Sequence, residues 1–209
     1  MKIAVIGTGN VGRALGTSWA SKGHEVIFGS RDPHSEKVRE ALTAAGSNAS
    51  AAAIAEAGAA ADVIVLATPW NTNQQVIEAL GDVTGKIIVD ATNPIGPGFQ
   101  LALGTTTSGA EQLAGWAQGA RVVKAFNTTG WENMADPIYH GEPATMFICG
   151  DDAEAKTVVS GLAADLGFEV ADTGPLSTAR YLEPLAMVWI HLAIVQQQGR
   201  QIAFKIIKR

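Results

Sequence analysis

A glycine-rich turn near the amino terminus is the clearest chemical signal in the sequence. Gly7, Gly9 and Gly12 come directly after the short apolar run Lys2–Ile6, and a helical pattern begins at Asn10. In this order of strand, turn and helix, the glycines allow a tight turn, close approach of a pyrophosphate, and close packing of helix on strand. The start of the helix adds N–H groups that bind phosphate oxygens. The predicted dinucleotide-binding residues are Gly7, Thr8, Gly9, Asn10, Val11 and Gly12. The alternative is a glycine-rich turn without a ligand.

The residues after the second apolar run, Glu25–Gly29, indicate which dinucleotide binds. An NAD enzyme usually has an acidic residue here to accept hydrogen bonds from the ribose, whereas this sequence has Ser30 and Arg31. A hydroxyl and a guanidinium suit the 2'-phosphate of NADP, and Lys37 in the next helix is a third candidate contact. We therefore predict NADP(H). The alternative is that Arg31 is a surface charge paired with Asp32, whose own expected role is in a turn.

Three further segments follow apolar runs, and in a parallel sheet they would meet at one edge. These segments are Thr68-Pro69-Trp70, Asp90–Pro94 and Lys124–Gly130. We expect them to line a cleft at the nicotinamide end of the cofactor, where Trp70 and Phe126 supply flat apolar surface for a planar acceptor. The remaining predicted cofactor-binding residues are Thr68, Pro69, Asn93 and Asn127. The alternative for each residue is a structural role, such as ending a strand, capping a helix or packing in the core.

The sequence has no pattern typical of acid–base, nucleophilic or metal chemistry. It lacks Gly-x-Ser-x-Gly, His-Glu-x-x-His and Tyr-x-x-x-Lys, and Cys149 has no second sulfur ligand. The histidines are scattered, and His191 lies in an apolar segment that favours a core or interface role. We therefore predict no catalytic side chain and no metal. A hydride transfer in which the protein only positions two ring systems fits this composition, with Trp70, Phe126 and Asn127 nearest to the reaction.

The composition limits the class of protein. The chain has 209 residues, 47% of them hydrophobic and 17% charged, which predicts one compact domain with a small extension. A formal charge of -5 gives no basic surface for nucleic acid. The longest apolar stretch, Leu185–Val195, is shorter than the roughly 18 to 20 residues that cross a bilayer. The single cysteine fits a reducing compartment, so we expect a cytoplasmic protein without membrane or nucleic-acid partners.

Short apolar runs without in/out alternation are separated by helical patterns, as in a parallel sheet covered on both faces. The predicted strands are Lys2–Ile6, Glu25–Gly29, Asp62–Ala67, Lys86–Asp90, Arg121–Ala125, Thr145–Cys149 and Phe168–Asp172. The predicted helices are Asn10–Ser21, Ser35–Ala45, Ala51–Gly58, Asn71–Leu80, Ser108–Gln118 and Asp151–Leu166, with one or two more over 178–207. The predicted fold is α/β, a doubly wound parallel sheet of the Rossmann type with a short helical C-terminal extension. We divide it into a dinucleotide-binding domain over 1–130 and a smaller α/β extension over 131–209.

Six motifs together resemble the NADPH:coenzyme F420 oxidoreductase family, from Met1 to about Ala193. They are Gly7–Gly12, Gly29–Arg31, Ala67–Trp70, Asp90–Pro94, Val122–Thr128 and Phe147–Asp151. The resemblance implies a Rossmann fold with a small extension, a homodimer, and reversible hydride transfer between NADP(H) and C5 of an 8-hydroxy-5-deazaflavin. The cytosolic domain of the six-transmembrane metalloreductases is also similar, and its acceptor is FAD. The candidate acceptors are therefore coenzyme F420, FMN and FAD. Two other classes stay open: an imine reductase of the pyrroline-carboxylate type and a non-catalytic NADP(H) sensor.

The segment Leu185–Val195 predicts how the chain assembles. Its residues leave no polar face apart from His191, and a helix that is apolar all round must be buried on every side. A second copy of the same helix would cover the side that the rest of this chain leaves open, as in two-fold homodimers. The alternative is a helix enclosed within its own monomer beneath Thr178–Pro184.

Overall fold

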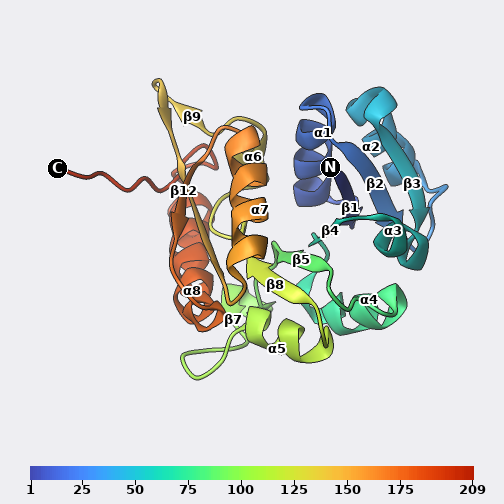
Figure 1. Ribbon diagram of the computed structural model, residues 1–209. Helices are drawn as coiled ribbons and strands as arrows, with labels where there is room; N and C mark the ends of the chain where they lie inside the picture. The colour runs from blue at the N-terminus through green and yellow to red at the C-terminus, as the bar shows by residue number, and fades with distance from the viewer.

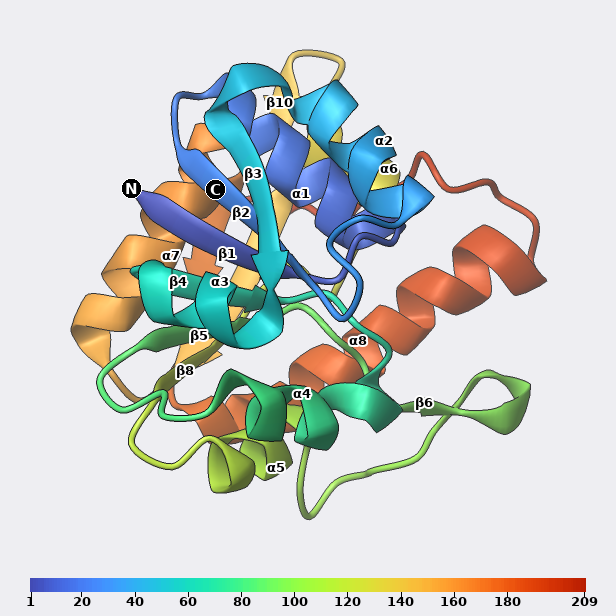
Figure 2. The same ribbon diagram turned by 90° about the vertical axis from the view of Figure 1, so that its right-hand side faces the viewer.

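The computed structural model describes residues 1–209, and its centre is one eight-stranded sheet (Figure 1). The strand order is β12-β11-β8-β5-β4-β1-β2-β3. These strands are β1 (Lys2–Ile6), β2 (Glu25–Ser30), β3 (Ala49–Ala53), β4 (Val63–Leu66), β5 (Ile87–Asp90), β8 (Arg121–Lys124), β11 (Thr145–Gly150) and β12 (Glu169–Asp172). Two hairpins lie outside the sheet: β6 (Ile95–Gly96) with β7 (Gln100–Leu101), and β9 (Ile138–Tyr139) with β10 (Glu142–Pro143). Figure 2 shows the hairpin of β6 projecting from the body of the molecule.

Helices cover both faces of the sheet. They are α1 (Asn10–Ser21), α2 (Glu36–Ala45), α3 (Ile54–Ala60), α4 (Asn73–Leu80), α5 (Gly109–Trp116), α6 (Trp131–Ala135), α7 (Ala153–Asp165) and α8 (Ala179–Ile190), the last continued by a π-helical turn over His191–Val195. Ile3 and Val5 of β1 face a core shared with α1, α2, α6 and α7. The alternate residues Ala4 and Ile6 face a second core shared with α3, α4, α5 and α8. Since both faces are buried at the centre of the sheet, β1 and β4 are apolar apart from Lys2, and the predicted fold class is confirmed.

One edge of the sheet departs from the parallel arrangement. β11 runs antiparallel to β8, with Cys149 opposite Lys124, and β12 is parallel to β11. The helix between β11 and β12, α7, begins with an aspartate cap, because the Asp152 side chain accepts a hydrogen bond from Ala155 N–H at 2.7 Å. The extension after residue 130 therefore adds two strands to the same sheet.

The alanine-rich segment after α2 corrects one prediction. Ala49–Ala53, part of which was expected to be helical, forms β3 and pairs in parallel with β2, so the helix spans only Ile54–Ala60. Helix propensity is a weak preference, and pairing with the free backbone of β2 outweighs it. Alanine side chains give no alternating pattern from which such an edge strand could be predicted.

The end of the chain corrects a second prediction. The helix ends at Val195, and residues 196–209 form neither helix nor strand, so the prediction of helix as far as Ile207 is wrong. The tail instead lies along β11: Thr145 N–H donates to the Phe204 carbonyl at 2.9 Å, and Ile206 N–H donates to Thr145 Oγ1 at 3.0 Å. Backbone hydrogen bonds to the open side of β11 are satisfied in this way.

The C-terminal helix is buried on one side only. Ala186, Trp189 and Ala193 face the protein, whereas Tyr181, Val188 and Val195 are 74%, 49% and 52% exposed. The alternative of a helix enclosed within its own monomer is therefore wrong. None of the helices is long and apolar enough to cross a bilayer.

Candidate functional site

The glycine-rich turn connects β1 to α1 at the carboxyl edge of the parallel strands. Gly7 has φ of +107°, and a side chain there would meet the Ala67 carbonyl oxygen at 2.8 Å. A Cβ on Gly12 would meet the Gly7 carbonyl oxygen at 1.9 Å. A Cβ on Gly9, by contrast, would have no protein atom within 4 Å. The fold therefore requires Gly7 and Gly12, while the space at Gly9 lies open to a ligand.

The start of α1 is suited to an anion. Gly9 is the N-cap residue, and no side chain caps the helix there. The first N–H groups of a helix have no partner within the helix, and they carry the positive end of its dipole. With the open space at Gly9, this arrangement fits a pyrophosphate, as the sequence predicted.

A cleft of about 400 Å³ opens beside this turn, between the carboxyl ends of β1, β2 and β4. It brings together eight of the predicted residues: Gly7, Thr8, Gly9, Ser30, Arg31, Lys37, Thr68 and Pro69. Ile54 and Val76 add apolar lining from α3 and α4. A cleft with apolar lining and a small number of polar groups is typical of cofactor sites.

The turn after β2 and the first turn of α2 each bring one unpaired cation to this cleft, Arg31 and Lys37 respectively. Ser30 Oγ donates to the Asp32 carbonyl at 3.1 Å, and the Asp32 carboxylate accepts from His34 N–H at 3.0 Å. Asp32 is thus a turn residue, as expected, and it forms no ion pair with Arg31. Arg31 and Lys37 are both exposed and both line the cleft, where they can bind a phosphate without first breaking an ion pair.

The two aromatic residues predicted to face the acceptor are placed elsewhere. Phe126 is 1% exposed, and its ring packs edge-on against Trp19 with centroids 5.5 Å apart, so the prediction that it lines the cleft is wrong. Its φ of +61° turns the side chain into the core at the point where β8 ends. The rings of Trp70 and Trp116 of α5 have centroids 6.2 Å apart, and the Trp70 indole nitrogen lies beside Gly109. It therefore faces α5 and not the nucleotide cleft.

Asn93 and Asn127 bind each other. Asn127 Nδ2 donates to Asn93 Oδ1 at 3.0 Å and to the Leu182 carbonyl at 3.1 Å, while Asn93 Nδ2 donates to the Asn127 carbonyl at 2.9 Å. The pair joins the segments after β5 and β8 to α8. Asn127 Oδ1 is buried without a partner, so it is the one atom of Asn127 that can accept a further hydrogen bond.

A buried ion cluster of Asp90, Lys124 and Glu183 lies under the same edge. Lys124 Nζ donates to Asp90 Oδ2 at 2.9 Å, to Glu183 Oε1 at 2.9 Å, and to the Thr92 carbonyl at 2.6 Å. Burial by itself lowers the pKa of Lys124, but the two carboxylates outweigh this effect and raise the pKa, so the amine is charged. The Glu183 carboxylate also accepts from Gly109 N–H at 2.9 Å and from Ala110 N–H at 3.1 Å, at the start of α5.

The meeting of these three charged residues was not predicted from the sequence. Asp90 and Lys124 stand side by side in the register of β5 and β8, which a sequence does not show. The available signal was a charge at the end of two apolar strands and a glutamate inside an apolar helix. Charged residues in such positions are almost always paired when they are fully buried.

Other reactive side chains are not organised for chemistry. Cys149 is buried, and burial raises the pKa of its thiol to about 11, so it is protonated near neutral pH. No group of three or more His, Cys, Asp or Glu residues is placed to hold a metal ion.

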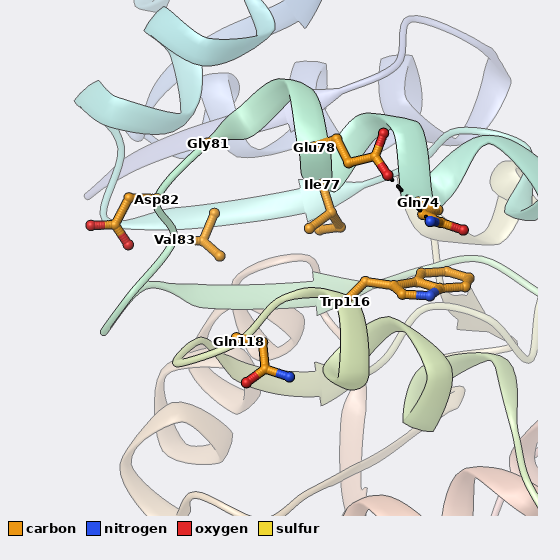
Figure 3. Close-up of a pocket in the computed structure, with 8 residues that line it drawn as sticks. All are labelled: Gln74, Ile77, Glu78, Gly81, Asp82, Val83, Trp116 and Gln118. Atoms are coloured by element: carbon orange, nitrogen blue, oxygen red, sulfur yellow. Dashed lines mark hydrogen bonds between the residues drawn. The ribbon is translucent and has the colours of Figure 1, made fainter.

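A second hollow, of about 390 Å³, lies between α4 and α5 (Figure 3). Ile77 and Val83 form its apolar side, and Trp116 and Gln118 lie opposite. Asp82 and Val83 belong to the loop before β5, at the amino end of that strand. The hollow is therefore separate from the nucleotide cleft, which lies at the carboxyl ends.

The sequence is similar to known proteins along its length. The family model for coenzyme F420-dependent NADP oxidoreductases matches residues 2–94. The F420-dependent NADP reductase of Methanothermobacter thermautotrophicus is 32% identical over 209 residues, which cover 93% of this chain and 90% of that protein. This chain belongs to the F420-dependent NADP reductase family. The predicted resemblance and the predicted class of enzyme, an NADP-dependent oxidoreductase, are confirmed at the level of the family.

The metalloreductase STEAP3 of Rattus norvegicus is also 32% identical, over 190 residues. The match covers 89% of this chain but only 36% of that protein, so the chain spans about a third of this relative. The similarity to metalloreductases thus concerns one part of a longer protein.

Solved structures agree with this assignment. A putative F420-dependent NADP-reductase from Arthrobacter sp. FB24 is 35% identical, with a TM-score of 0.91 and complete coverage of both chains. An imine reductase from Bacillus cereus has a TM-score of 0.69 at 18% identity, and the match covers 62% of its chain. That second likeness shows a shared fold and nothing about the reaction.

Proposed function

We propose that the chain binds NADP(H) in the cleft beside the glycine-rich turn and transfers hydride between NADP(H) and a planar acceptor, with the deazaflavin coenzyme F420 as the first candidate. The observation that carries the proposal is the open space at Gly9, next to the uncapped start of α1 and in one cleft with Arg31 and Lys37. A bound pyrophosphate needs the open space and the free N–H groups at the start of α1, and a bound 2'-phosphate needs the two cations.

The residues of the cleft divide the binding between them. The N–H groups at the start of α1 would bind the pyrophosphate, because Gly9 leaves room for it to approach the backbone. Arg31 and Lys37 would bind the 2'-phosphate, with the fork of guanidinium donors giving the stronger and more directional contact. Ser30 begins the turn that holds Arg31 in place.

The protein's contribution to the reaction is positioning. Bound NADPH would supply the hydride from C4 of its nicotinamide ring. The Asn93–Asn127 pair holds the ends of β5 and β8 together, where the nicotinamide end of a dinucleotide lies in this type of sheet. The thiol of Cys149 is buried and protonated, and the Lys124 ammonium uses all three of its donors within the protein. The role of the chain in this proposal is therefore to position the two ring systems, and no side chain is assigned to acid–base chemistry.

The family supports a deazaflavin acceptor, and the likeness to a metalloreductase supports a flavin. Incubation with NADPH and, separately, coenzyme F420, FMN, FAD, a quinone, a ferric chelate and a cyclic imine tests the choice through the loss of the nicotinamide absorbance. Oxidation with coenzyme F420 that is faster than with every other acceptor supports the proposal. Turnover of the imine alone would indicate an imine reductase, and binding without any turnover would indicate a sensor.

We propose also that the chain forms a homodimer through α8. The side of the helix that faces away from the sheet carries Tyr181, Val188, Ile194 and Val195, all of them exposed in the single chain. An apolar helix face is stable in water when another apolar surface covers it. A second copy offers the same face, and a two-fold axis brings the two together.

A further inference from the structure

A chain of buried hydrogen bonds leads from the ion cluster to the wall of the nucleotide cleft. Thr92 Oγ1 donates to Asp90 Oδ1 at 2.6 Å, and Asn73 Nδ2 donates to Thr92 Oγ1 at 3.0 Å. Thr68 Oγ1 then donates to Asn73 Oδ1 at 2.9 Å. Asn73 and Thr92 are 0% and 5% exposed, whereas Thr68 is half-buried and lines the cleft. The chain therefore joins a charge in the core to an atom that a ligand can touch.

Asp90 determines the direction of every hydrogen bond in this chain. Its carboxylate faces donors only: Lys124 Nζ at 2.9 Å, Thr92 N–H at 3.0 Å and the Thr92 hydroxyl. The Thr92 hydroxyl must donate its hydrogen bond to the carboxylate, so its oxygen acts as the acceptor for the amide NH2 of Asn73. The side-chain oxygen of Asn73 then faces Thr68 and accepts the hydrogen bond of its hydroxyl.

The consequence at the cleft is that Thr68 has no proton left to donate to a ligand. Its oxygen keeps free lone pairs and can only accept a hydrogen bond there. Phosphate oxygens are acceptors, so they gain nothing from this hydroxyl, although Thr68 lies next to the glycine-rich turn: a Cβ on Gly7 would be 3.1 Å from its methyl group. The matching groups of NADP(H) are its donors, which are the adenine NH2, the ribose hydroxyls and the carboxamide NH2. Thr68 follows β4, on the opposite side of β1 from β2 and Arg31, so the donors that face it are those of the nicotinamide half.

We propose that Asp90 is a positioning residue that makes Thr68 a hydrogen-bond acceptor, and that Thr68 thereby selects a donor group in the nicotinamide half of NADP(H). This inference rests on the proposed nucleotide cleft and adds the chemical character of one contact in it. The role of Asp90 passes through Thr92 and Asn73, because Asp90 itself is 0% exposed and reaches no ligand.

Replacing Asp90 with asparagine reverses the chain. The amide oxygen of the new residue faces Lys124, because an ammonium only donates, and its NH2 group then donates to Thr92 Oγ1. The Thr92 N–H, which bonds Asp90 Oδ1 in the wild-type protein, loses its acceptor in this variant. The Thr92 hydroxyl turns to Asn73, whose amide flips, and Thr68 accepts from Asn73 NH2. Its own proton then points into the cleft. In Asp90→Asn, Thr68 becomes a donor where it was an acceptor.

The test compares the dissociation constants of NADP⁺ and of two analogues by calorimetry. One analogue carries an acetyl group in place of the carboxamide, and the other lacks both hydroxyls of the nicotinamide ribose. The wild-type protein should prefer NADP⁺ over one analogue by roughly 2- to 12-fold, the typical worth of one hydrogen bond. The analogue that binds more weakly identifies the donor.

Variants of the chain decide whether Thr68 and Asp90 cause this preference. Thr68→Val and Asp90→Asn should abolish it, whereas Thr68→Ser, which keeps the hydroxyl, should retain it. Thr173→Val is the matched control, because its half-buried hydroxyl bonds the Ile148 carbonyl far from the cleft. If Asp90→Asn fails to fold, Thr92→Val cuts the same chain and should also lose the preference.

Two outcomes overturn the inference: a wild-type protein that distinguishes neither analogue, and a preference that survives in Thr68→Val. A preference that persists in folded Asp90→Asn or Thr92→Val would remove the role of Asp90. Failure of the wild-type protein to bind NADP⁺ at all would instead tell against the proposed function.

Discussion

Gly9 and Gly12 lie one helical turn apart, yet a side chain would have opposite consequences at the two positions. At Gly12 it would overlap the carbonyl oxygen of Gly7, whereas at Gly9 it would enter empty space. One glycine therefore serves the packing of α1 on β1, and the other serves a ligand. This contrast separates the stability of the turn from its binding role, and it can be measured.

Gly9→Val should fold with little change in the midpoint of thermal unfolding and should lose binding of both NADPH and NADH. The valine would occupy the volume that the pyrophosphate needs, and its Cβ would have no neighbouring protein atom within 4 Å. Gly12→Val is the matched variant, and it should fail to fold. Nucleotide fluorescence titration and circular dichroism measure the two effects, and tight NADPH binding by folded Gly9→Val would show that the phosphate site lies elsewhere.

Arg31→Asp should weaken NADPH binding by about 1.5 to 3 kcal/mol while changing NADH binding little, because only NADPH carries the 2'-phosphate. The change removes a charge-assisted hydrogen bond and adds a repulsive charge. Arg39→Asp, on the exposed side of α2, is the control for the altered net charge. Equal losses for both nucleotides would contradict the assignment of Arg31 to the 2'-phosphate.

Lys124→Met should destabilise the protein by about 3 to 5 kcal/mol, the usual cost of leaving buried charges unpaired. Asp90 and Glu183 would lose their shared cation in a site where Lys124 is 0% exposed. Urea unfolding measures the loss. The exposed pair of Lys2 and Glu25 supplies the comparison, because Lys2→Met should cost less than about 1 kcal/mol. A cost that small for Lys124→Met would show that the ion cluster does not stabilise the fold.

The pair of Glu111 and Arg180 should make stability depend on acidity. The hydrogen bond from Arg180 is the largest influence on Glu111 and lowers the pKa of that carboxyl below its ordinary value of 4.5, although partial burial opposes the shift. The stabilisation is complete above the ordinary pKa and is lost as the pH falls through the lowered value. Glu111→Gln should therefore flatten the dependence of unfolding free energy on pH below about 4.5. If the unfolding free energy of this variant falls with pH as steeply as that of the wild-type protein, the ion pair contributes nothing to the acid dependence of stability.

Val188→Glu should convert a dimer into a monomer, because it places a charge in the exposed apolar face of α8, where Val188 is 49% exposed. Light scattering at micromolar concentration measures the change. Since the position is exposed in the single chain, the variant should fold. Ala164→Glu, at an exposed neutral position of α7, is the control for the added negative charge. A wild-type protein that is monomeric at this concentration would remove the dimer proposal.

The sequence predicted those parts of the fold that depend on local pattern. The run Lys2–Ile6, the turn at Gly7 and the helix from Asn10 were recognisable because each follows from residue type and spacing within one segment. The conformation of Ala49–Ala53 depends on the neighbouring strand β2, which the alanines do not reveal.

The same division holds for the candidate site: contacts within one segment were predictable, and contacts between distant segments were not. Residues that act through their own backbone or charge, such as Gly9 and Arg31, line the cleft as predicted. Phe126 was misplaced because its direction depends on a positive φ that no pattern indicates. The ion cluster was missed because Lys124 and Glu183 are 59 residues apart, and only the packing of α8 brings them together.

The most direct test of the account is to follow one hydrogen atom. NADPH carrying deuterium at the transferred position of C4 is incubated with the protein and coenzyme F420, and the reduced deazaflavin is analysed by mass spectrometry and NMR. The account predicts one deuterium on carbon C5 of the product, with wild-type protein and not with Gly9→Val. Reduced product without deuterium, or equal labelling by the Gly9→Val variant, would contradict hydride transfer at this cleft.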